Sequence, residues 1–311
     1  MKTMFCLFWV LLFGPGDLAA QHRLITQGHE RLAIVNKKGD IEWEMKWGAT
    51  HDMHVLPNQH ILILEGANRI VEIDPATKSV VWSYDAAQMN GNAGKNVEVH
   101  AFQPLGDGKL MIAESGPGRI IEIDREGKLL TQIKLKLDRP HPHMDTRLVR
   151  KLNNGNYLVS HEGDGFAREY DANGKVVWEF EVPLSGREPA DGHGPEAWGN
   201  KLFCALRLAN GNTLIATGNG HSVIEVNPAK QIVWQLSQNE LPNITLAWVT
   251  TLEVLANGNY LIGNCHAGPA QPLLVEIQPK SKTVIWQFDQ FETFGNSVSN
   301  SQILDAAGAI R

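Results

Sequence analysis

The sequence has few cysteines, no block of like charges and only one long apolar run. Three cysteines among 311 residues exclude a disulfide-dense scaffold, so a hydrophobic core has to hold the fold together. The formal net charge of -6, without a basic cluster, argues against nucleic acid or an anionic membrane as a partner. Helical periodicity longer than a turn or two is also missing. These absences favour an all-β chain with a large core.

The one apolar run lies at the start of the chain, in MKTMFCLFWVLLFGPGDLAA. A lysine, an apolar segment over residues 4–13 and a Gly-Pro break before small residues are typical of a secretory signal peptide. The segment is too short to span a bilayer. We therefore predict a signal peptide over residues 1–20, one domain over residues 21–311, no membrane segment after cleavage, and a secreted or periplasmic location. Cys204 and Cys265 then remain and can form one disulfide.

The chain repeats itself every 47 to 56 residues. Three segments share an Asn-Gly-Asn turn between two apolar runs: LVRKLNNGNYLVSHEG, ALRLANGNTLIATGNG and TLEVLANGNYLIGNCH. Asn-Gly between such runs is a strong hairpin signal, because both residues tolerate a positive φ. A second hairpin follows each copy, and its last strand usually carries a tryptophan: Trp43, Trp82, Trp178, Trp234 or Trp286.

One unit is therefore four antiparallel strands, and such units repeated around a ring form a β-propeller. Five units are complete. The sixth is split between HRLITQGHERLAIVNKKGDIEWEMKW near the start and SNSQILDAAGAIR at the end. We predict a six-bladed β-propeller with four antiparallel strands per blade, its last blade closed by the N- and C-terminal strands, because this pairing removes two exposed edges. A β-sandwich or a two-domain β protein explains neither the period nor the split unit.

Long loops and histidines gather on one face of the predicted ring. The connections between blades and the loops between second and third strands share that face, and ten of the twelve histidines fall there. Imidazole titrates nearest to neutral pH and is the commonest metal ligand, so this face is the candidate site. The loop over residues 183–202 is long enough to act as a lid. The plain alternative is that loops favour polar residues.

Two sets of residues carry the predicted chemistry. The catalytic candidates lie near the starts of strands that line the channel: His54, His100, His143 and Arg147. The substrate-binding candidates lie in the loops around them: Glu114, His161, Glu162, His193, His221, Trp248 and His266. The glutamates have a structural alternative, since they recur at equivalent places and can bond loop N–H groups. Trp248 has one too, as a blade-packing residue.

Two hairpins resemble known propeller families. VEIDPATKSVVWSY is similar to the repeat of quinoprotein-type, PQQ-like propellers, which implies PQQ as a cofactor. The eight blades and adjacent cysteines of the larger dehydrogenases are missing, so PQQ is disfavoured. LANGN, with histidines at strand starts, resembles the bacterial arylsulfotransferase-like propellers. That resemblance implies export and a transiently sulfated histidine, with His54, His100, His143 and Arg147 at matching places. The extra N-terminal β domain of those enzymes is absent here.

Three functions stay open at this point. The first is an exported enzyme that acts on a small polar or anionic substrate, by arylsulfotransferase-like group transfer or by metal-assisted elimination as in propeller lyases. The second is a non-catalytic propeller that binds a glycan or a protein. The third is a PQQ-dependent sugar dehydrogenase. The expected partner is a small molecule or carbohydrate, and a divalent metal is compatible with the histidine set. The sequence leaves the oligomeric state open.

Overall fold

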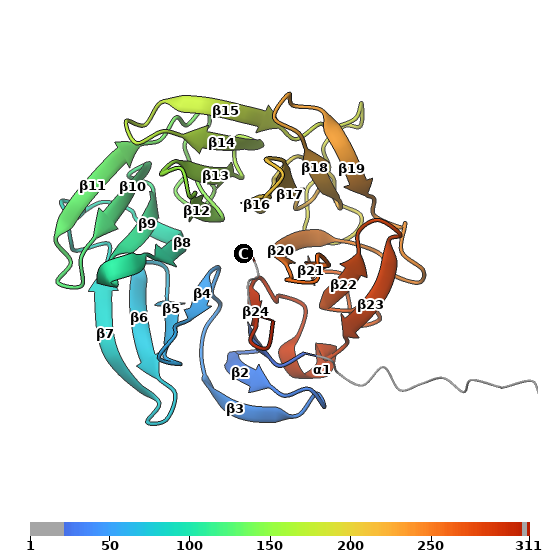
Figure 1. The fold of residues 1–311 in the computed structure, drawn as a ribbon, viewed down its shortest axis with the longest axis horizontal. Coiled ribbons are helices and arrows are strands. Elements are labelled where there is room, and N and C mark those ends of the chain that lie inside the picture. Colours follow the sequence, from blue (N-terminus) through green and yellow to red (C-terminus); the bar gives the residue numbers. More distant parts are fainter. Residues whose placement is uncertain (1–21, 307–309) are drawn as a thin grey trace, which may run out of the picture.

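The computed structural model describes residues 22–306 and 310–311. Within them, six four-stranded antiparallel sheets stand around a common axis (Figure 1). The predicted six-bladed propeller is confirmed, with four strands in every blade. The predicted signal peptide, residues 1–20, lies outside the described residues. Among the helices of the described part, none has the length and apolar character that a membrane span requires.

Blades 1 to 5 each use four consecutive strands, counted from the axis outward. Blade 1 consists of β4 (Met53–Val55), β5 (Ile61–Glu65), β6 (Arg69–Asp74) and β7 (Ser79–Asp85). Blade 2 consists of β8 (Glu98–Pro104), β9 (Leu110–Ser115), β10 (Arg119–Ile123) and β11 (Leu129–Lys134). Blade 3 consists of β12 (Val149–Lys151), β13 (Tyr157–His161), β14 (Phe166–Tyr170) and β15 (Val176–Glu181). Blades 4 and 5 are β16 (Cys204–Arg207), β17 (Thr213–Ala216), β18 (Val223–Val226), β19 (Ile232–Leu236); and β20 (Trp248–Val254), β21 (Tyr260–Cys265), β22 (Leu274–Gln278), β23 (Thr283–Phe288). A four-residue helix, α1 (Phe291–Phe294), lies in the connection after blade 5.

Blade 6 joins the two ends of the chain. Its strands are β24 (Ser301–Ile303), β1 (Leu24–Gly28), β2 (Arg31–Val35) and β3 (Ile41–Lys46). Leu24 pairs with Ile303 and Thr26 with Ser301, in antiparallel register. The split unit predicted from the sequence is thus one continuous sheet, and the ring is closed by hydrogen bonds between residues far apart in the chain.

The core lies between neighbouring blades. The second and third strands are apolar on both faces, because each blade packs against two others: in β9 all six residues are buried. One apolar cluster fills each interface; Leu62 of blade 1, for example, packs with Phe102 of blade 2. The outermost strands alternate between half-buried and exposed residues, as in the pattern of β3, because only one of their faces meets a neighbour.

Three of the five repeated tryptophans form a hydrogen bond to the neighbouring blade. The indole Nε1 of Trp82 donates a hydrogen bond of 2.7 Å to the carbonyl of Arg125, in the outer turn of the next blade. Trp43 and Trp234 make the same bond to Pro75 and Pro279. Trp178 occupies the equivalent place, but its buried indole nitrogen has no acceptor among the described residues.

The two cysteines of the propeller do not pair with each other. Cys204 begins β16 and Cys265 ends β21, and both are buried free thiols. Burial raises the pKa of each thiol to about 12, so neither is a thiolate at neutral pH. The disulfide left open by the sequence is absent from the described chain.

Candidate functional site

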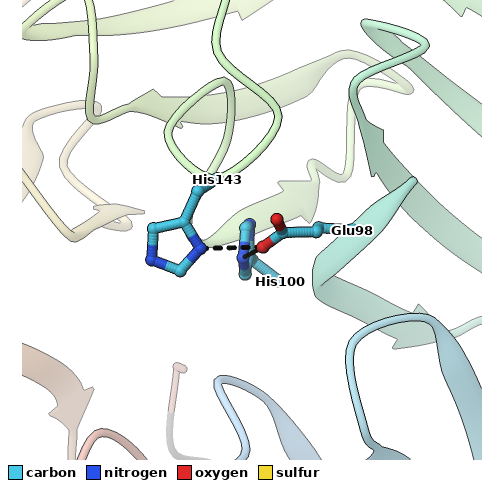
Figure 2. A group of neighbouring side chains, drawn as sticks. All are labelled: Glu98, His100 and His143. Atoms are coloured by element: carbon cyan, nitrogen blue, oxygen red, sulfur yellow. Dashed lines mark hydrogen bonds and ion pairs between the residues drawn. The ribbon is translucent and has the colours of Figure 1, made fainter. Parts of the chain in front are cut away.

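Three side chains converge on the face that carries the long connections. Figure 2 shows Glu98 and His100 on β8 and His143 on the connection before β12. Glu98 Oε2 lies 2.7 Å from His143 Nδ1 and 3.2 Å from His100 Nε2. One possible ligand atom from each residue lies within 4.8 Å of the others. The group therefore has the composition and the spacing of a two-histidine, one-carboxylate metal site.

A β-bulge places His100 in this group. The pairing of β8 with β9 slips between Val99 and Ala101, so His100 is the extra residue and has no partner on β9. Bulges of this kind re-aim a side chain at the edge of a sheet. Glu98 starts the same strand two residues earlier, which brings both side chains to one place.

Burial and charge fix the protonation of this group. Only 3% of His100 is exposed, and its Nδ1 lies 3.0 Å from the carbonyl oxygen of Thr146. Burial and the nearby Arg147 guanidinium lower the pKa of His100 to about 4, against the raising effect of Glu98. The close contacts with His100 and His143 lower the pKa of Glu98 to about 2, against the raising effect of burial. At neutral pH the group thus contains a carboxylate and a neutral imidazole.

His51 extends the cluster from a third connection, the one before β4. Its ring centroid lies 4.9 Å from that of His100 and 6.3 Å from that of His143. Burial, and then the charges of Arg147 and the two histidines, hold the pKa of His51 well below its ordinary value. Its Nδ1 is buried and meets no hydrogen-bond partner within residues 22–306 and 310–311. His51 is therefore a neutral imidazole with one nitrogen unused.

Arg147 supplies positive charge next to these rings. Only 4% of Arg147 is exposed, and its Nε donates a hydrogen bond to Glu162. Its guanidinium lies 5.6 Å from the ring centroid of Phe203, and the same ring lies 6.0 Å from His51. The Nη1 of Arg147 is buried and finds no acceptor in the part of the chain that the structure describes. This nitrogen can donate to a ligand.

A second group lies beyond Phe203. His193, in the long loop predicted as a lid, has its ring centroid 4.6 Å from Trp248 and 5.0 Å from His266. Trp248 packs with Phe203 and Cys265 in a buried cluster. The loop therefore reaches from blade 3, past blade 4, to blade 5.

The other predicted site residues make hydrogen bonds within the protein scaffold. His161 bonds the carbonyl of Asp145 through Nδ1 and the Tyr170 hydroxyl through Nε2. Both nitrogens of His221 face carbonyls, those of Ala247 and Ala197, at 2.8 and 2.5 Å.

The last two predicted residues are also engaged. The Nε2 of His54 lies 2.8 Å from the carbonyl of Phe102, and its Nδ1 faces Arg311. Glu114 is buried and its Oε2 accepts from Arg119 at 2.6 Å, whereas its Oε1 meets no donor among the described residues. The structure thus brings together His100, His143, Arg147 and Glu162 in one group and His193, Trp248 and His266 in another. It holds His54, His161, His221 and Glu114 in hydrogen bonds of the scaffold.

Two members of the main cluster were not among the predicted site residues. Glu98 was missed, although Glu-Val-His at the start of an inner strand was a usable signal. His51 was placed on the correct face but not in the site, because nothing in one connection indicates which others it will meet.

The opposite end of the ring axis has a hollow of about 670 Å³. Arg150, Lys151 and Arg207 line it. Each of these cations is already paired with a carboxylate of the protein. Buried nitrogens without a partner among the described residues occur at both ends: Nε of Arg207 and Arg311 in this hollow, and His51 Nδ1 and Arg147 Nη1 on the histidine face. The histidine face also gathers Glu98, His100 and His143, and for that reason we take it as the candidate site.

Comparison with known proteins places the chain in a family. The family model described as outer membrane protein assembly factor BamB matches residues 28–288. The chain belongs to this family. The predicted PQQ-like repeat is thereby confirmed, whereas the arylsulfotransferase-like resemblance stays a prediction. No curated protein matches the chain.

Solved structures share the fold of this family member. A protein of unknown function from Bacteroides caccae is 24% identical, with a TM-score of 0.73 over 90% of this chain and 98% of that one. A catalytically inactive histidine-to-alanine variant of virginiamycin B lyase from Staphylococcus aureus, bound to quinupristin, is 11% identical. Its TM-score is 0.56, over 92% of this chain and 96% of that one. At these identities the likeness shows the propeller fold.

Proposed function

We propose that this protein is an exported enzyme that binds a small anionic substrate beside Arg147 and transforms it by elimination or group transfer with His51 as base or nucleophile. The observation that carries the proposal is the buried Nη1 of Arg147, which lacks an acceptor among the described residues and adjoins two neutral imidazoles. The apolar run at residues 4–13 and the family's description, which names the outer membrane, support an extracytoplasmic location.

The unused nitrogen of Arg147 favours an anion as ligand. A buried donor without a partner costs about 1–3 kcal/mol, and more when the group is charged. Glu162 holds the Nε edge of the guanidinium and balances its charge, which leaves Nη1 for a carboxylate or sulfate oxygen. Because the carboxylate of Glu162 also orients the guanidinium, the arginine is fixed before a ligand arrives.

His51 gains basicity when an anion binds. The free ring has a lowered pKa partly because of the Arg147 charge. A bound anion offsets that charge, so the proton affinity of His51 rises in the complex. In an elimination, His51 takes a proton from the carbon next to the acid group, and Arg147 stabilises the negative charge that develops; the freed electron pair then forms a double bond as the group on the β carbon leaves with its bonding electrons. In a transfer, the same neutral nitrogen attacks the group, and the leaving oxygen departs with the bonding electrons.

The test combines two assays with two variants. Purified protein is incubated with 4-nitrophenyl sulfate and a phenol acceptor, and separately with a uronate polysaccharide whose unsaturated product absorbs in the ultraviolet. Arg147→Lys keeps Glu162 paired but lacks the planar fork, so we expect roughly 10- to 100-fold weaker substrate binding. His51→Asn is expected to lower kcat about 100- to 10,000-fold.

His60→Gln is the matched control, because His60 lies in a tight turn of the opposite face and bonds Glu72. We expect this variant to keep full activity. Anion binding by calorimetry without turnover in either assay would instead favour the non-catalytic glycan-binding propeller. Equal activity in the wild type, Arg147→Lys and His51→Asn would overturn the proposed site.

A further inference from the structure

We infer that Glu98, His100 and His143 bind one divalent first-row transition-metal ion. The inference adds a cofactor to the site of the proposed function and, as a statement about catalysis, rests on that proposal. The metal site itself rests on geometry. Three donor atoms from three residues lie within 4.8 Å of one another, and Figure 2 shows their side chains turned toward a common point.

The tautomer of His100 favours binding of a cation between this ring and Glu98. The carbonyl oxygen of Thr146, 3.0 Å from Nδ1, can only accept a hydrogen bond, so Nδ1 carries the ring proton. Nε2 then presents a lone pair, yet it faces Glu98 Oε2 at 3.2 Å. A carboxylate oxygen also only accepts. Two lone pairs thus face each other, and a cation between them removes the repulsion.

A second proton on His100 would also remove the repulsion, but its surroundings oppose it. The ring is only 3% exposed, and no solvent surrounds it. A buried imidazolium beside another cation has no solvent to stabilise it. A metal ion, unlike a second proton, binds the lone pairs of both His100 and Glu98 directly, and Nδ1 of His100 keeps its proton.

The spacing of the donor atoms suits an ion of this kind. Donors around Zn²⁺ with bonds of about 2.0–2.1 Å lie roughly 3.3 Å apart in a tetrahedral site. The separation between His100 Nε2 and Glu98 Oε2 is 3.2 Å. The contact between His143 Nδ1 and Glu98 Oε2 is 2.7 Å and has to open by about half an ångström. His143 can move, since half of its side chain is exposed and it lies on a connection.

The donor set also selects the type of metal. Two neutral imidazoles and one carboxylate suit zinc, iron(II), manganese or cobalt, whereas calcium and magnesium prefer oxygen ligands. Three protein ligands leave at least one open position for a water or a substrate oxygen. The same anion can then contact the ion and Arg147, while Glu162 keeps the arginine charge balanced.

The experiment measures metal binding apart from activity. The full chain is freed of metal with a chelator and titrated with Co²⁺, followed by its visible absorption, and with Zn²⁺, followed by calorimetry. We expect one ion per chain. Glu98→Gln and His143→Ala should each weaken Zn²⁺ binding by more than about 100-fold. His60→Gln, on the opposite face, should leave it unchanged.

Circular dichroism of each variant shows whether the propeller is intact. Both site variants are expected to fold, because Glu98 and His143 are partly exposed. Absence of stoichiometric Co²⁺ or Zn²⁺ binding, or equal affinity in the folded site variants, would overturn the inference. Metal binding without turnover would leave the inference standing and defeat the proposed function. Turnover that survives complete chelation would leave the proposed function standing and contradict a role of the ion in catalysis.

Discussion

Arg150 of blade 3 forms a bidentate ion pair with Asp52 of blade 1. Its Nη1 and Nη2 donate to the two carboxylate oxygens at 2.8 and 3.0 Å. Asp52 also accepts the backbone N–H of Phe102 in blade 2 at 3.1 Å. Burial alone would raise the pKa of Asp52, but the charges of Arg150 and His54 hold it far below its usual range. One carboxylate therefore ties three blades together.

Removing one charge of the buried Asp52–Arg150 pair should destabilise the fold. We expect Asp52→Asn to lower the free energy of unfolding by about 3–5 kcal/mol, because Arg150 stays buried without a counter-ion. The exposed pair between Arg31 and Glu44 is the control, and Arg31→Ala should cost less than about 1 kcal/mol. Urea unfolding at neutral pH, at an unchanged m-value, measures both. Similar losses for the two variants would contradict the assigned role of Asp52.

Glu253 should make stability depend on pH. This carboxyl on β20 is fully buried and accepts the N–H of Ile303 at 3.1 Å. Burial raises its pKa to about 7, against the lowering effects of Arg311, the Ile303 N–H and His22. A raised folded-state pKa gives stability that is complete below about pH 4.5 and is lost as the pH rises through about 7.

One substitution tests whether Glu253 causes this pH dependence. Glu253→Gln cannot ionise, so we expect it to remove this part of the pH dependence and to be more stable than the wild type at pH 8, by on the order of 3 kcal/mol. Unfolding curves between pH 5 and pH 8 check this. The idea fails if the variant keeps the slope of the wild type over that range.

Two tryptophans at equivalent places should respond differently to phenylalanine. Trp82→Phe loses the bond to the Arg125 carbonyl, and the guanidinium of Arg125, which lies 4.2 Å from the indole centroid, loses its best partner ring. Trp178→Phe removes a buried donor that has no acceptor in the described chain. We expect Trp82→Phe to be less stable than Trp178→Phe by about 1 kcal/mol or more in thermal or urea unfolding. The opposite order would show that the bond between blades contributes nothing.

His221 should anchor the long loop of residues 183–202. Its ring bonds the carbonyl of Ala197, within that loop, at 2.5 Å. His221→Asn tolerates the positive φ of 50° but cannot reach both carbonyls, so we expect trypsin to cleave the loop several-fold faster at Arg187 or Lys201. His29→Asn, at a turn with φ of 46°, controls for the strain. Equal cleavage rates in the two variants would rule out an anchoring role.

The architecture was predictable because its signals are local. Asn-Gly turns such as Asn210-Gly211 and the strand tryptophans lie within single hairpins, and a repeat of such hairpins allows few arrangements. The split blade followed from counting strands. Each of these predictions depends on residues less than a blade apart in the chain.

The site was only partly predictable because it forms between connections. His51, His100 and His143 come from three neighbouring blades and meet only when these blades pack together. The bulge that turns His100 toward Glu98 has no signal of its own in the sequence. His54 follows His51 by three positions, yet the first joins the cluster and the second bonds the Phe102 carbonyl, a difference that strand position alone does not reveal.

Blade 6 can close only after the last strand, β24, has been synthesised, so β1 lacks this partner until then. β1 is among the first described strands to be made, and its partner β24 follows after all the strands of blades 1 to 5. At about 5–20 residues per second, this delay is roughly 15 to 60 s. Throughout it, Leu24, Ile25 and Thr26 present unpaired backbone groups along an apolar strand. A nascent chain of this protein therefore needs shielding at its beginning for longer than at any later blade.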